Sequence, residues 1–229
     1  MRKEFEIDLY DGHLIIEENG MKILVDTGSP VTIGRDSRFS FMEQSHHCVT
    51  SLMGTDISSV SRLMNYSVDV LLGMDVLKQY CILVDYRNKR VTFSTEGIPF
   101  DSATAVPLQC GRMGEVCVVL TVNGVEAKLA LDTGAKISYI DETFTVGQTE
   151  LEAREDFNPM VGRFQTTLYD MQASINGMEF PVHFGKLPSS LALTLQMLGL
   201  RGAIGYDLFD SFVVLMDFHN RVLSLRENS

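Results

Sequence analysis

The feature that most constrains this chain is an apolar run ending on Asp-Thr-Gly, which occurs twice. The first copy spans Ile23–Ser29 and the second spans Leu129–Ala135. A short run of Leu, Val and Ile bounded by a turn signal is typical of a buried strand. Burial of a carboxylate at the end of such a strand is costly unless the group is paired or shares a proton. Two such strands, one in each half of the chain, therefore predict two carboxylates that meet, Asp26 and Asp132.

The rest of the chain repeats in the same order. Each half continues to an apolar-apolar-Gly motif, which ends at Gly73 in the first half and at Gly205 in the second. A short helix and a closing hairpin follow each motif. Self-similarity on this scale indicates an internal duplication. We expect an N-terminal lobe of residues 1–100 and a C-terminal lobe of residues 101–229, with the Pro-containing stretch Gly97–Pro107 as the linker.

Local signals predict tight turns between strands. They also predict one further helix in each half, at a similar position in the two halves. Asp56 is expected to cap a helix that runs to about Asn65. Ser189 or Ser190 is expected to cap a second helix that ends before Gly199. Asn-Gly pairs are strong hairpin signals, and they occur at residues 19–20, 123–124 and 176–177.

The spacing of the motifs shows where the halves differ. Asp26 and Asp132 are 106 residues apart (132 − 26), whereas Gly73 and Gly205 are 132 apart (205 − 73). The second half therefore holds 26 additional residues (132 − 106) before its glycine motif. That length fits one additional long hairpin. We expect it within residues 158–184, where a mobile hairpin beside a cleft would form a lid.

Composition and charge disfavour several classes of function. The chain of 229 residues carries a formal net charge of −11, with a sequence pI near 4.8. An acidic surface repels phosphate, which disfavours binding to nucleic acid and to anionic membranes. No apolar run is long enough to span a bilayer, and the N-terminus lacks the apolar core of a signal peptide. A cytoplasmic location with no membrane partner is expected.

No metal or cofactor is expected. His46, His47 and Cys48 stand together in a polar segment, but no second ligand pair follows at a suitable spacing, so a solvated loop is expected there. Four cysteines at irregular spacings, without a Cys-x-x-Cys pair, favour reduced thiols. Phosphate loops, nucleophile elbows and dinucleotide fingerprints do not occur in a suitable context.

The two Asp-Thr-Gly copies, each after an apolar strand and each followed by apolar-apolar-Gly, resemble the aspartic proteases of the pepsin and retropepsin clan. The resemblance covers nearly the whole chain and is that of a single-chain tandem duplication of a retropepsin-like unit. It implies an all-β, two-lobed acid-protease-like β-barrel fold, with a short helix or two per lobe and an active-site cleft between the lobes. It also implies an aspartic-type endopeptidase that is a monomer, because both aspartates lie in one chain.

By this resemblance Asp26 and Asp132 form the catalytic dyad, and Thr27 and Thr133 brace the two loops across the interface. Two carboxylates a few ångströms apart share one proton and titrate as a coupled pair. The ionised member takes a proton from water while the protonated member polarises the scissile carbonyl. The substrate would be a peptide or protein bound in extended form. Further residues that would support the two loops are Gly28, Ser29, Gly73, Gly134, Ala135 and Gly205.

The resemblance also predicts a flap, a hairpin that covers the substrate. Here it is expected on the C-terminal lobe, since only the second half holds the additional hairpin, whereas pepsins carry a flap on the N-terminal lobe. Its tip is expected at Val161, Gly162 and Arg163, and Tyr169 is a candidate flap tyrosine. The acidic stretch Glu150–Asp156 is expected to be a solvated connection that precedes the hairpin.

The two motif copies differ just after the glycine, where the first has Ser29 and the second has Ala135. A hydroxyl at this place can donate to the neighbouring carboxylate and favour its charged form. Asp26 is therefore expected to ionise more readily, and Asp132 to hold the shared proton. On this basis Ser29→Ala should move the acidic limb of the pH–rate profile upward.

Three other interpretations stay open at this point. Both Asp-Thr-Gly segments could be ordinary turns in which the aspartate accepts local backbone hydrogen bonds. The chain could be a peptide-binding or scaffolding module that keeps a two-lobed cleft but has little catalysis. The two lobes could also fail to face each other, so that the chain dimerises instead.

Overall fold

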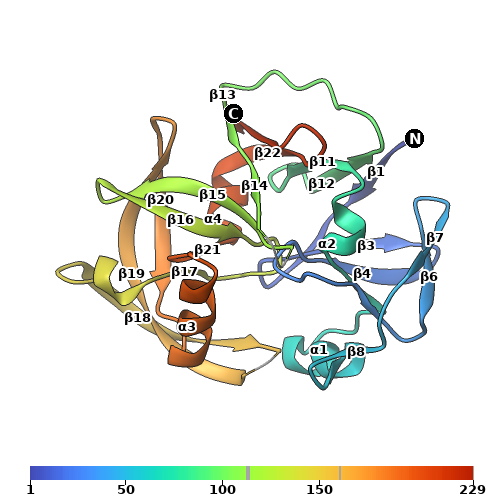
Figure 1. Ribbon diagram of the computed structural model, residues 1–229, viewed down its shortest axis with the longest axis horizontal. Helices are drawn as coiled ribbons and strands as arrows, with labels where there is room; N and C mark the ends of the chain where they lie inside the picture. Colours follow the sequence, from blue (N-terminus) through green and yellow to red (C-terminus); the bar gives the residue numbers. More distant parts are fainter. Residues whose placement is uncertain (112–113, 160, 229) are drawn as a thin grey trace.

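The computed structural model describes residues 1–111, 114–159 and 161–228. Over these residues the chain consists mainly of β-strands, with four α-helices and one 3-10 helix. The all-β fold class expected from the sequence is confirmed, and each half carries two of the short α-helices (Figure 1). None of the described helices is long and apolar enough to cross a membrane.

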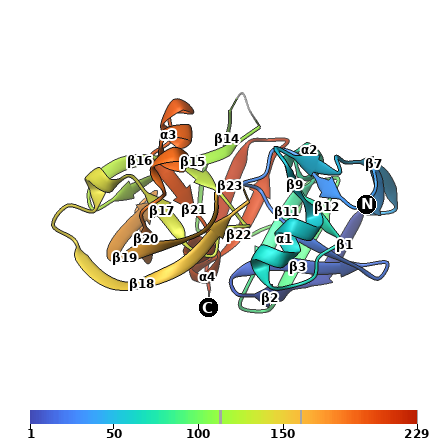
Figure 2. The same cartoon turned by 90° about the horizontal axis from the view of Figure 1, so that it is seen from below.

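A six-stranded sheet joins the two halves of the chain. Its two inner strands, β11 and β22, pair antiparallel, with Val84 opposite Val214. Each half contributes three strands, and the strands of the two halves lie side by side in Figure 2. In order across the sheet they are β1 (Arg2–Glu6), β12 (Arg90–Ser94), β11 (Cys81–Asp85), β22 (Phe212–Asp217), β23 (Val222–Glu227) and β13 (Thr104–Pro107).

A five-stranded sheet forms the body of the first lobe. Strands β4 and β10 are adjacent and parallel, with Val25 opposite Leu72. The strand that leads to Asp26 therefore lies beside the strand that leads to Gly73. The side chains of Val25 and Leu72 are fully buried, as is usual for apolar parallel strands. The strands in order are β2 (Asp8–Tyr10), β3 (His13–Glu18), β4 (Met21–Val25), β10 (Val70–Leu72) and β5 (Ile33–Gly34).

An eight-stranded sheet forms the body of the second lobe and contains the same arrangement. Strands β16 and β21 are parallel, with Leu131 opposite Ile204, so the strand leading to Asp132 lies beside the strand leading to Gly205. The strands in order are β14 (Gln109–Cys110), β15 (Val116–Val122), β16 (Val125–Leu131), β21 (Gly202–Ile204), β17 (Ser138–Ile140), β20 (Met178–Gly185), β19 (Gly162–Ile175) and β18 (Thr149–Asn158).

The helices follow the sequence signals except at one cap. Helix α1 (Ile57–Met64) is capped by Asp56, whose carboxylate accepts from the Ser59 amide at 2.7 Å. Helix α3 (Ser189–Met197) begins earlier than expected, with Pro188 at the N-cap and no side-chain cap. The expectation of a serine cap is therefore wrong, because both serines already lie inside the helix. The remaining helices are α2 (Met74–Leu77), α4 (Tyr206–Ser211) and the 3-10 helix η1 (Glu142–Phe144).

All three Asn-Gly pairs form the predicted hairpin turns. Asn19, Asn123 and Asn176 have φ near +50°, and the glycine after each also has a positive φ. Two consecutive positive φ values match the right-handed twist of the strands that such a turn connects. These turns join β3 to β4, β15 to β16 and β19 to β20.

One segment expected to be a solvated loop is instead a hairpin. Strands β6 (Arg38–Phe41) and β7 (Gln44–His47) pair antiparallel, and His46 is buried beside Phe41. The loop expectation is wrong because the turn uses Met42 and Glu43 at positive φ, which the sequence does not signal. A shorter ribbon, β8 (Ser51–Leu52) with β9 (Thr55–Asp56), follows it.

The hairpin expected within residues 158–184 is present, as β19 paired with β20 across the turn at Asn176 and Gly177, but the strand that precedes it was not predicted. Strand β18 pairs antiparallel with β19 from Thr149 to Asn158, so the acidic stretch Glu150–Asp156 is a strand and not a solvated connection. The error has a physical cause: the first seven residues of β18 are exposed and show no alternation of burial. We call β18, β19 and the turn between them (residues 149–175) the flap hairpin.

One apolar core runs through both lobes. It includes Phe93 from the first half and Phe184 from the second, together with the joining pair Val84 and Val214, and all four side chains are fully buried. A smaller cluster lies under α1 in the first lobe. The continuous core and the shared sheet make the two lobes one packed body over the described residues.

The shared sheet gives a direct stability prediction. Val214→Ala removes two buried methyl groups at the junction of the lobes, so the free energy of unfolding should fall by about 2 kcal/mol. Val125→Ala is a matched control, because Val125 is 55% exposed, and it should change the free energy by less than about 0.5 kcal/mol. Urea unfolding measures both, and equal effects would contradict a core that is continuous through β22.

Candidate active site

Both aspartates sit at the ends of buried strands and are held there by the neighbouring parallel strand. Asp26 follows β4, and its amide donates to the Leu72 carbonyl at 3.0 Å. Asp132 follows β16, and its amide donates to the Ile204 carbonyl at 2.9 Å. We call residues 26–32 and 132–138 the first and second aspartate loops. The two loops have equivalent anchors in the two lobes.

Four hydrogen bonds tie the two aspartate loops to each other. The Thr27 amide donates to Thr133 Oγ1 at 3.0 Å, and the Thr133 amide donates to Thr27 Oγ1 at 3.0 Å. Each hydroxyl then donates to a carbonyl of the opposite strand, Thr27 to Leu131 and Thr133 to Val25, both at 2.7 Å. Both threonines are 1% exposed. The exchange fixes the spacing of the two loops.

The glycines allow each loop to approach the carboxylate of the other. A Cβ on Gly28 would lie 2.4 Å from an oxygen of Asp132, and a Cβ on Gly134 would lie 2.7 Å from Cγ of Asp26. Any side chain at either position would collide with the opposite aspartate. The two carboxylates therefore meet at the contact between the loops, as the repeat predicts.

The other two motif glycines lie directly against the aspartate loops. A Cβ on Gly73 would meet the backbone of Val31 at 2.4 Å, and one on Gly205 would meet the Ala135 carbonyl at 2.2 Å. The residue after each glycine donates to an aspartate loop. The Met74 amide donates to the Ser29 carbonyl at 2.8 Å, and the Tyr206 amide donates to the Ala135 carbonyl at 3.0 Å.

Sequence reasoning missed a second matched set of supports. In the first lobe Thr32 accepts from the Gly73 amide at 3.0 Å and donates to Asp75 at 2.6 Å. In the second lobe Ser138 accepts from the Gly205 amide at 3.2 Å and donates to Asp207. The sequence did contain a signal for these supports. Thr32 and Ser138 are 106 residues apart, as are the two aspartates, and Asp75 and Asp207 are 132 apart, as are Gly73 and Gly205.

Burial and proximity perturb both carboxylates in the same direction. Burial raises the pKa of Asp26 well above its ordinary value, and the negative charge of Asp132 raises it further. Burial also raises the pKa of Asp132, while the hydrogen bond from the Gly134 amide opposes that rise. Because each charge disfavours the other, the pair titrates as a unit and holds one proton over an extended pH range.

The expectation that Asp26 ionises first is wrong, and so is the reason given for it. Beyond the effect of burial, which raises both pKa values, the hydrogen bond between the two carboxyls raises the pKa of Asp26 and lowers the pKa of Asp132, so Asp26 holds the shared proton. The Ser29 hydroxyl donates to the Val31 carbonyl at 2.8 Å and not to the aspartate. It is the backbone amides of Gly28 and Ser29 that donate to Asp26, at 2.9 and 3.0 Å. Ser29→Ala leaves these amides in place, so it is expected to leave the acidic limb of a pH–rate profile unchanged.

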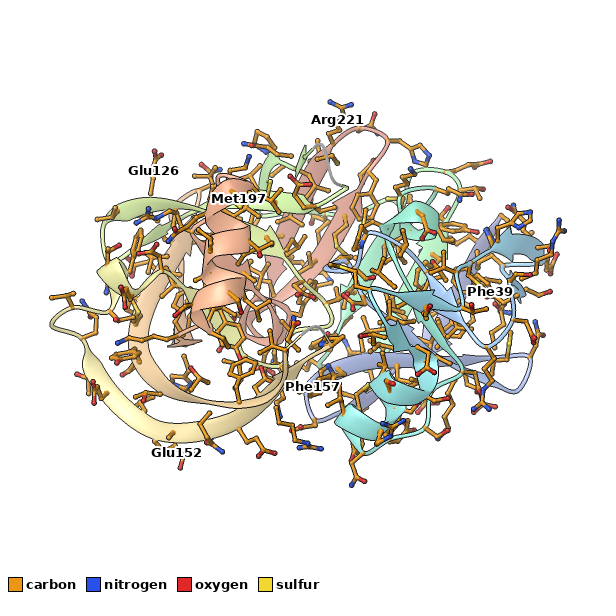
Figure 3. The ribbon with its side chains drawn as sticks, turned by 60° about the horizontal axis from the view of Figure 1, so that its bottom comes forward. Phe39, Glu126, Glu152, Phe157, Met197 and Arg221 are labelled. Carbon is orange, nitrogen blue, oxygen red and sulfur yellow. The ribbon has the colours of Figure 1, made fainter. Side chains whose placement is uncertain are left out.

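The flap hairpin reaches from the second lobe to the first. Its tip side chain Arg163 donates to the Leu63 carbonyl of α1 at 2.8 Å, and the Thr55 hydroxyl donates to the Pro159 carbonyl at 2.9 Å. Figure 1 shows the hairpin ending beside α1, and Figure 3 shows Phe157 between the two lobes. Val161 and Gly162 lie at the tip of the hairpin, the position predicted for them, and Val161 is 42% exposed.

The structure places two aromatic side chains near the flap where the sequence did not predict them. Tyr169 is not at the tip, because it is buried in the core at the base of the hairpin, where its hydroxyl donates to Glu150 at 3.1 Å. His13, which the sequence did not single out, is buried against Phe157, and its Nδ1 lies 2.7 Å from the Gly134 carbonyl. Burial lowers the pKa of His13, so the neutral ring donates through Nδ1.

Neither metal ligation nor sequence comparison adds evidence about the function of this site. Among the described residues, no group of three or more His, Cys, Asp and Glu side chains could hold a metal ion. No protein-family model matches the sequence, and no curated protein matches it.

Two solved structures have a distant likeness to the chain. One is a retropepsin-like aspartic protease from Rickettsia conorii, at 18% identity and a TM-score of 0.37, covering 56% of this chain and 96% of that one. The other is the protease of simian foamy virus, at 17% identity and a TM-score of 0.26, covering 35% of this chain and 94% of that one. At these values neither likeness says anything about activity.

The threonine exchange predicts a large effect from a small change. Thr133→Val leaves the Thr27 amide and the Val25 carbonyl without partners in a buried site, which should lower the free energy of unfolding by about 3 kcal/mol. Thr133→Ser keeps the hydroxyl and should cost less than about 1 kcal/mol. Chemical unfolding of both variants tests this, and equal stabilities would contradict the exchange.

The raised pKa values predict that the aspartates reduce stability at neutral pH. A carboxyl whose folded-state pKa is raised stabilises the fold below its unfolded pKa, and that contribution is lost as the pH rises through the folded pKa. Asp26→Asn keeps an acceptor for the loop amides but removes the charge. Its Tm should therefore exceed the wild-type Tm at pH 7, and the gain should shrink as the pH falls through the raised folded-state pKa and be gone below about pH 4.

Thermal unfolding followed by circular dichroism from pH 3 to 8 measures this difference. The exposed Asp101→Asn is the control and should follow the wild type at each pH. A lower Tm for Asp26→Asn at pH 7 would contradict the pairing of the two carboxylates.

Proposed function

We propose that the chain is an aspartic endopeptidase, a single-chain tandem duplication of a retropepsin-like unit. The observation that supports this most is the reciprocal exchange between Thr27 and Thr133. It brings two buried carboxylates together at the contact of two equivalent loops. A protein that needed only two turns would have no reason to bury and pair Asp26 and Asp132, since that arrangement costs stability at neutral pH.

In the proposed reaction one carboxylate of the pair is ionised and the other is protonated. The ionised carboxylate takes a proton from water as the water oxygen bonds to the scissile carbonyl carbon. The protonated carboxyl donates to the carbonyl oxygen and stabilises the tetrahedral intermediate. Collapse of the intermediate re-forms the carbonyl and breaks the C–N bond, and the proton gained from water passes to the leaving amine. No covalent enzyme adduct and no cofactor is required.

The proposed substrate is an extended peptide or protein segment that binds between the lobes and under the flap hairpin. Residues 1–100 and 101–229 would act as the two lobes of one catalytic unit. The chain would work as a monomer, because each lobe supplies one aspartate. The flap tip, Val161, Gly162 and Arg163, would close over the substrate, and opening would break the contacts from Arg163 to α1.

The alternative is a peptide-binding or scaffolding module that uses the same cleft with little catalysis. The contacts of the flap with the first lobe are compatible with this function as well. Two glycines that admit the opposite carboxylates favour the enzyme, because a binding module has no need of paired acids.

Cleavage of a diverse peptide library from pH 3 to 8 tests the proposal. Wild type should cut, while Asp26→Asn and Asp132→Asn should each lose about 10²- to 10⁴-fold in rate, because either change removes half of an acid–base pair. Asp101→Asn should behave as wild type. If wild type binds extended peptides but cuts none at any pH, the binding module replaces the enzyme.

A further inference from the structure

The flap hairpin carries a buried carboxylate that the proposed chemistry does not use. Asp156 on β18 is 6% exposed, although the seven residues that precede it on the strand are exposed. Burial raises the pKa of this carboxyl. A buried carboxylate is tolerated when it is paired and hydrogen-bonded, so its partners indicate what it is for.

The Phe157 amide donates to Oδ1 of Asp156 at 2.8 Å, and the side-chain partners of Asp156 come from the segment that begins at the second catalytic aspartate. The Tyr139 hydroxyl donates to Oδ2 of Asp156, and Nζ of Lys136 lies 3.8 Å from Oδ1. Tyr139 and Lys136 are seven and four residues after Asp132. Burial and the charge of Asp156 raise the pKa of Tyr139, so its hydroxyl stays protonated and remains a donor. The flap is thus tied by side chains to the second aspartate loop.

The same junction extends to the first lobe. Nζ of Lys136 lies 2.9 Å from Asp11 in the turn between β2 and β3. Phe157, the neighbour of Asp156, lies with its ring 5.7 Å from that of His13, the first residue of β3. His13 in turn donates to the second aspartate loop. One set of contacts therefore joins the flap, the second aspartate loop and the first lobe.

We propose that Asp156 is a positioning residue, which holds the flap hairpin against the second aspartate loop and places a negative charge beside Asp132. The kinetic part of this proposal rests on the proposed endopeptidase function. The part that concerns the contact between the flap and the second aspartate loop does not depend on that function.

The charge of Asp156 acts on the dyad in a known direction. It raises the pKa of Asp132, adding to the effect of burial. The titratable and charged groups that face Asp156 are Tyr139 of β17, Lys136 and Asp132 of the second aspartate loop, and Asp11 of the first lobe. Removing the negative charge should lower the pKa of Asp132. Because Asp132 is the ionised member of the pair, the acidic limb of activity, where that member is protonated, should then move to lower pH.

Asp156→Asn tests both parts of the proposal, because asparagine keeps an oxygen that can accept from Tyr139 but has no charge. We expect its acidic limb at lower pH and a KM raised several-fold by the loss of the pairing with Lys136. Glu152→Gln is the matched control: it makes the same change of charge on the same strand, at an exposed residue paired with Arg154. An Asp156→Asn profile identical to that of Glu152→Gln would overturn the proposal.

Tyr139→Phe tests the anchor in a chain that retains the Asp156 carboxylate. Loss of one charge-assisted hydrogen bond should raise KM about ten-fold, with a smaller effect on kcat, because the flap closes less firmly on the substrate. This variant keeps the proposal falsifiable if Asp156→Asn does not fold. An unchanged KM would overturn the positioning role.

A titration without substrate separates this proposal from the proposed function. The 13C signal of the Asp132 carboxyl can be followed with pH in wild type and in Asp156→Asn, and its midpoint should be lower in the variant. An unchanged midpoint in folded Asp156→Asn overturns the proposal even if peptides are cleaved. A lowered midpoint in a protein that cleaves no peptide supports it, while contradicting the endopeptidase.

Discussion

The hydrogen bonds exchanged by Thr27 and Thr133 cross from one half of the chain to the other, and the site depends on them. Each hydroxyl satisfies a backbone amide of the opposite loop and a carbonyl of the opposite strand, in a position where water cannot take over either task. A buried group without its partner costs free energy, so neither loop is complete alone. The same exchange brings the two aspartates together, which links the stability of the interface to the chemistry of the pair.

Around this symmetric centre the surroundings are unequal. The second lobe alone supplies the flap hairpin, while the first lobe supplies the α1 surface on which the tip rests. His13 and Asp11 approach the second aspartate loop from the first lobe. If the chain binds a peptide as proposed, a two-fold arrangement of aspartates would treat both ends of the peptide alike, whereas one flap and one set of charged contacts would distinguish them. The proposed role of Asp156 follows from this asymmetry.

Much of the framework could be predicted because short local sequence patterns determine it. An apolar run that ends on a carboxylate, and asparagine followed by glycine, have few structural interpretations, and both behave as expected. The strand β18 could not be found in this way, since it is exposed over its first seven residues and has no buried face to produce alternation. The turn at Met42 and Glu43 was missed because neither residue normally signals a positive φ.

Some details of the site could likewise be predicted from local sequence patterns, and others could not. The positions of the loop residues follow from the repeat, but the direction of a hydroxyl does not, and Ser29 donates to a nearby carbonyl that the sequence could not identify. Thr32 and Asp75 could have been found, because their counterparts Ser138 and Asp207 have the spacing of the motifs. The burial of Asp156 depends on the three-dimensional approach of the flap to Tyr139, which no local pattern encodes.

The central claim is that Asp26 and Asp132 of the same chain form one catalytic pair. Mixing Asp26→Asn with Asp132→Asn chains tests it most directly, with peptide cleavage followed over a range of ratios and concentrations. If each molecule builds its own pair, no mixture regains activity, because every chain carries one asparagine at its only pair. Activity that returns on mixing and grows with concentration would show that aspartates from two chains meet, and would contradict the account.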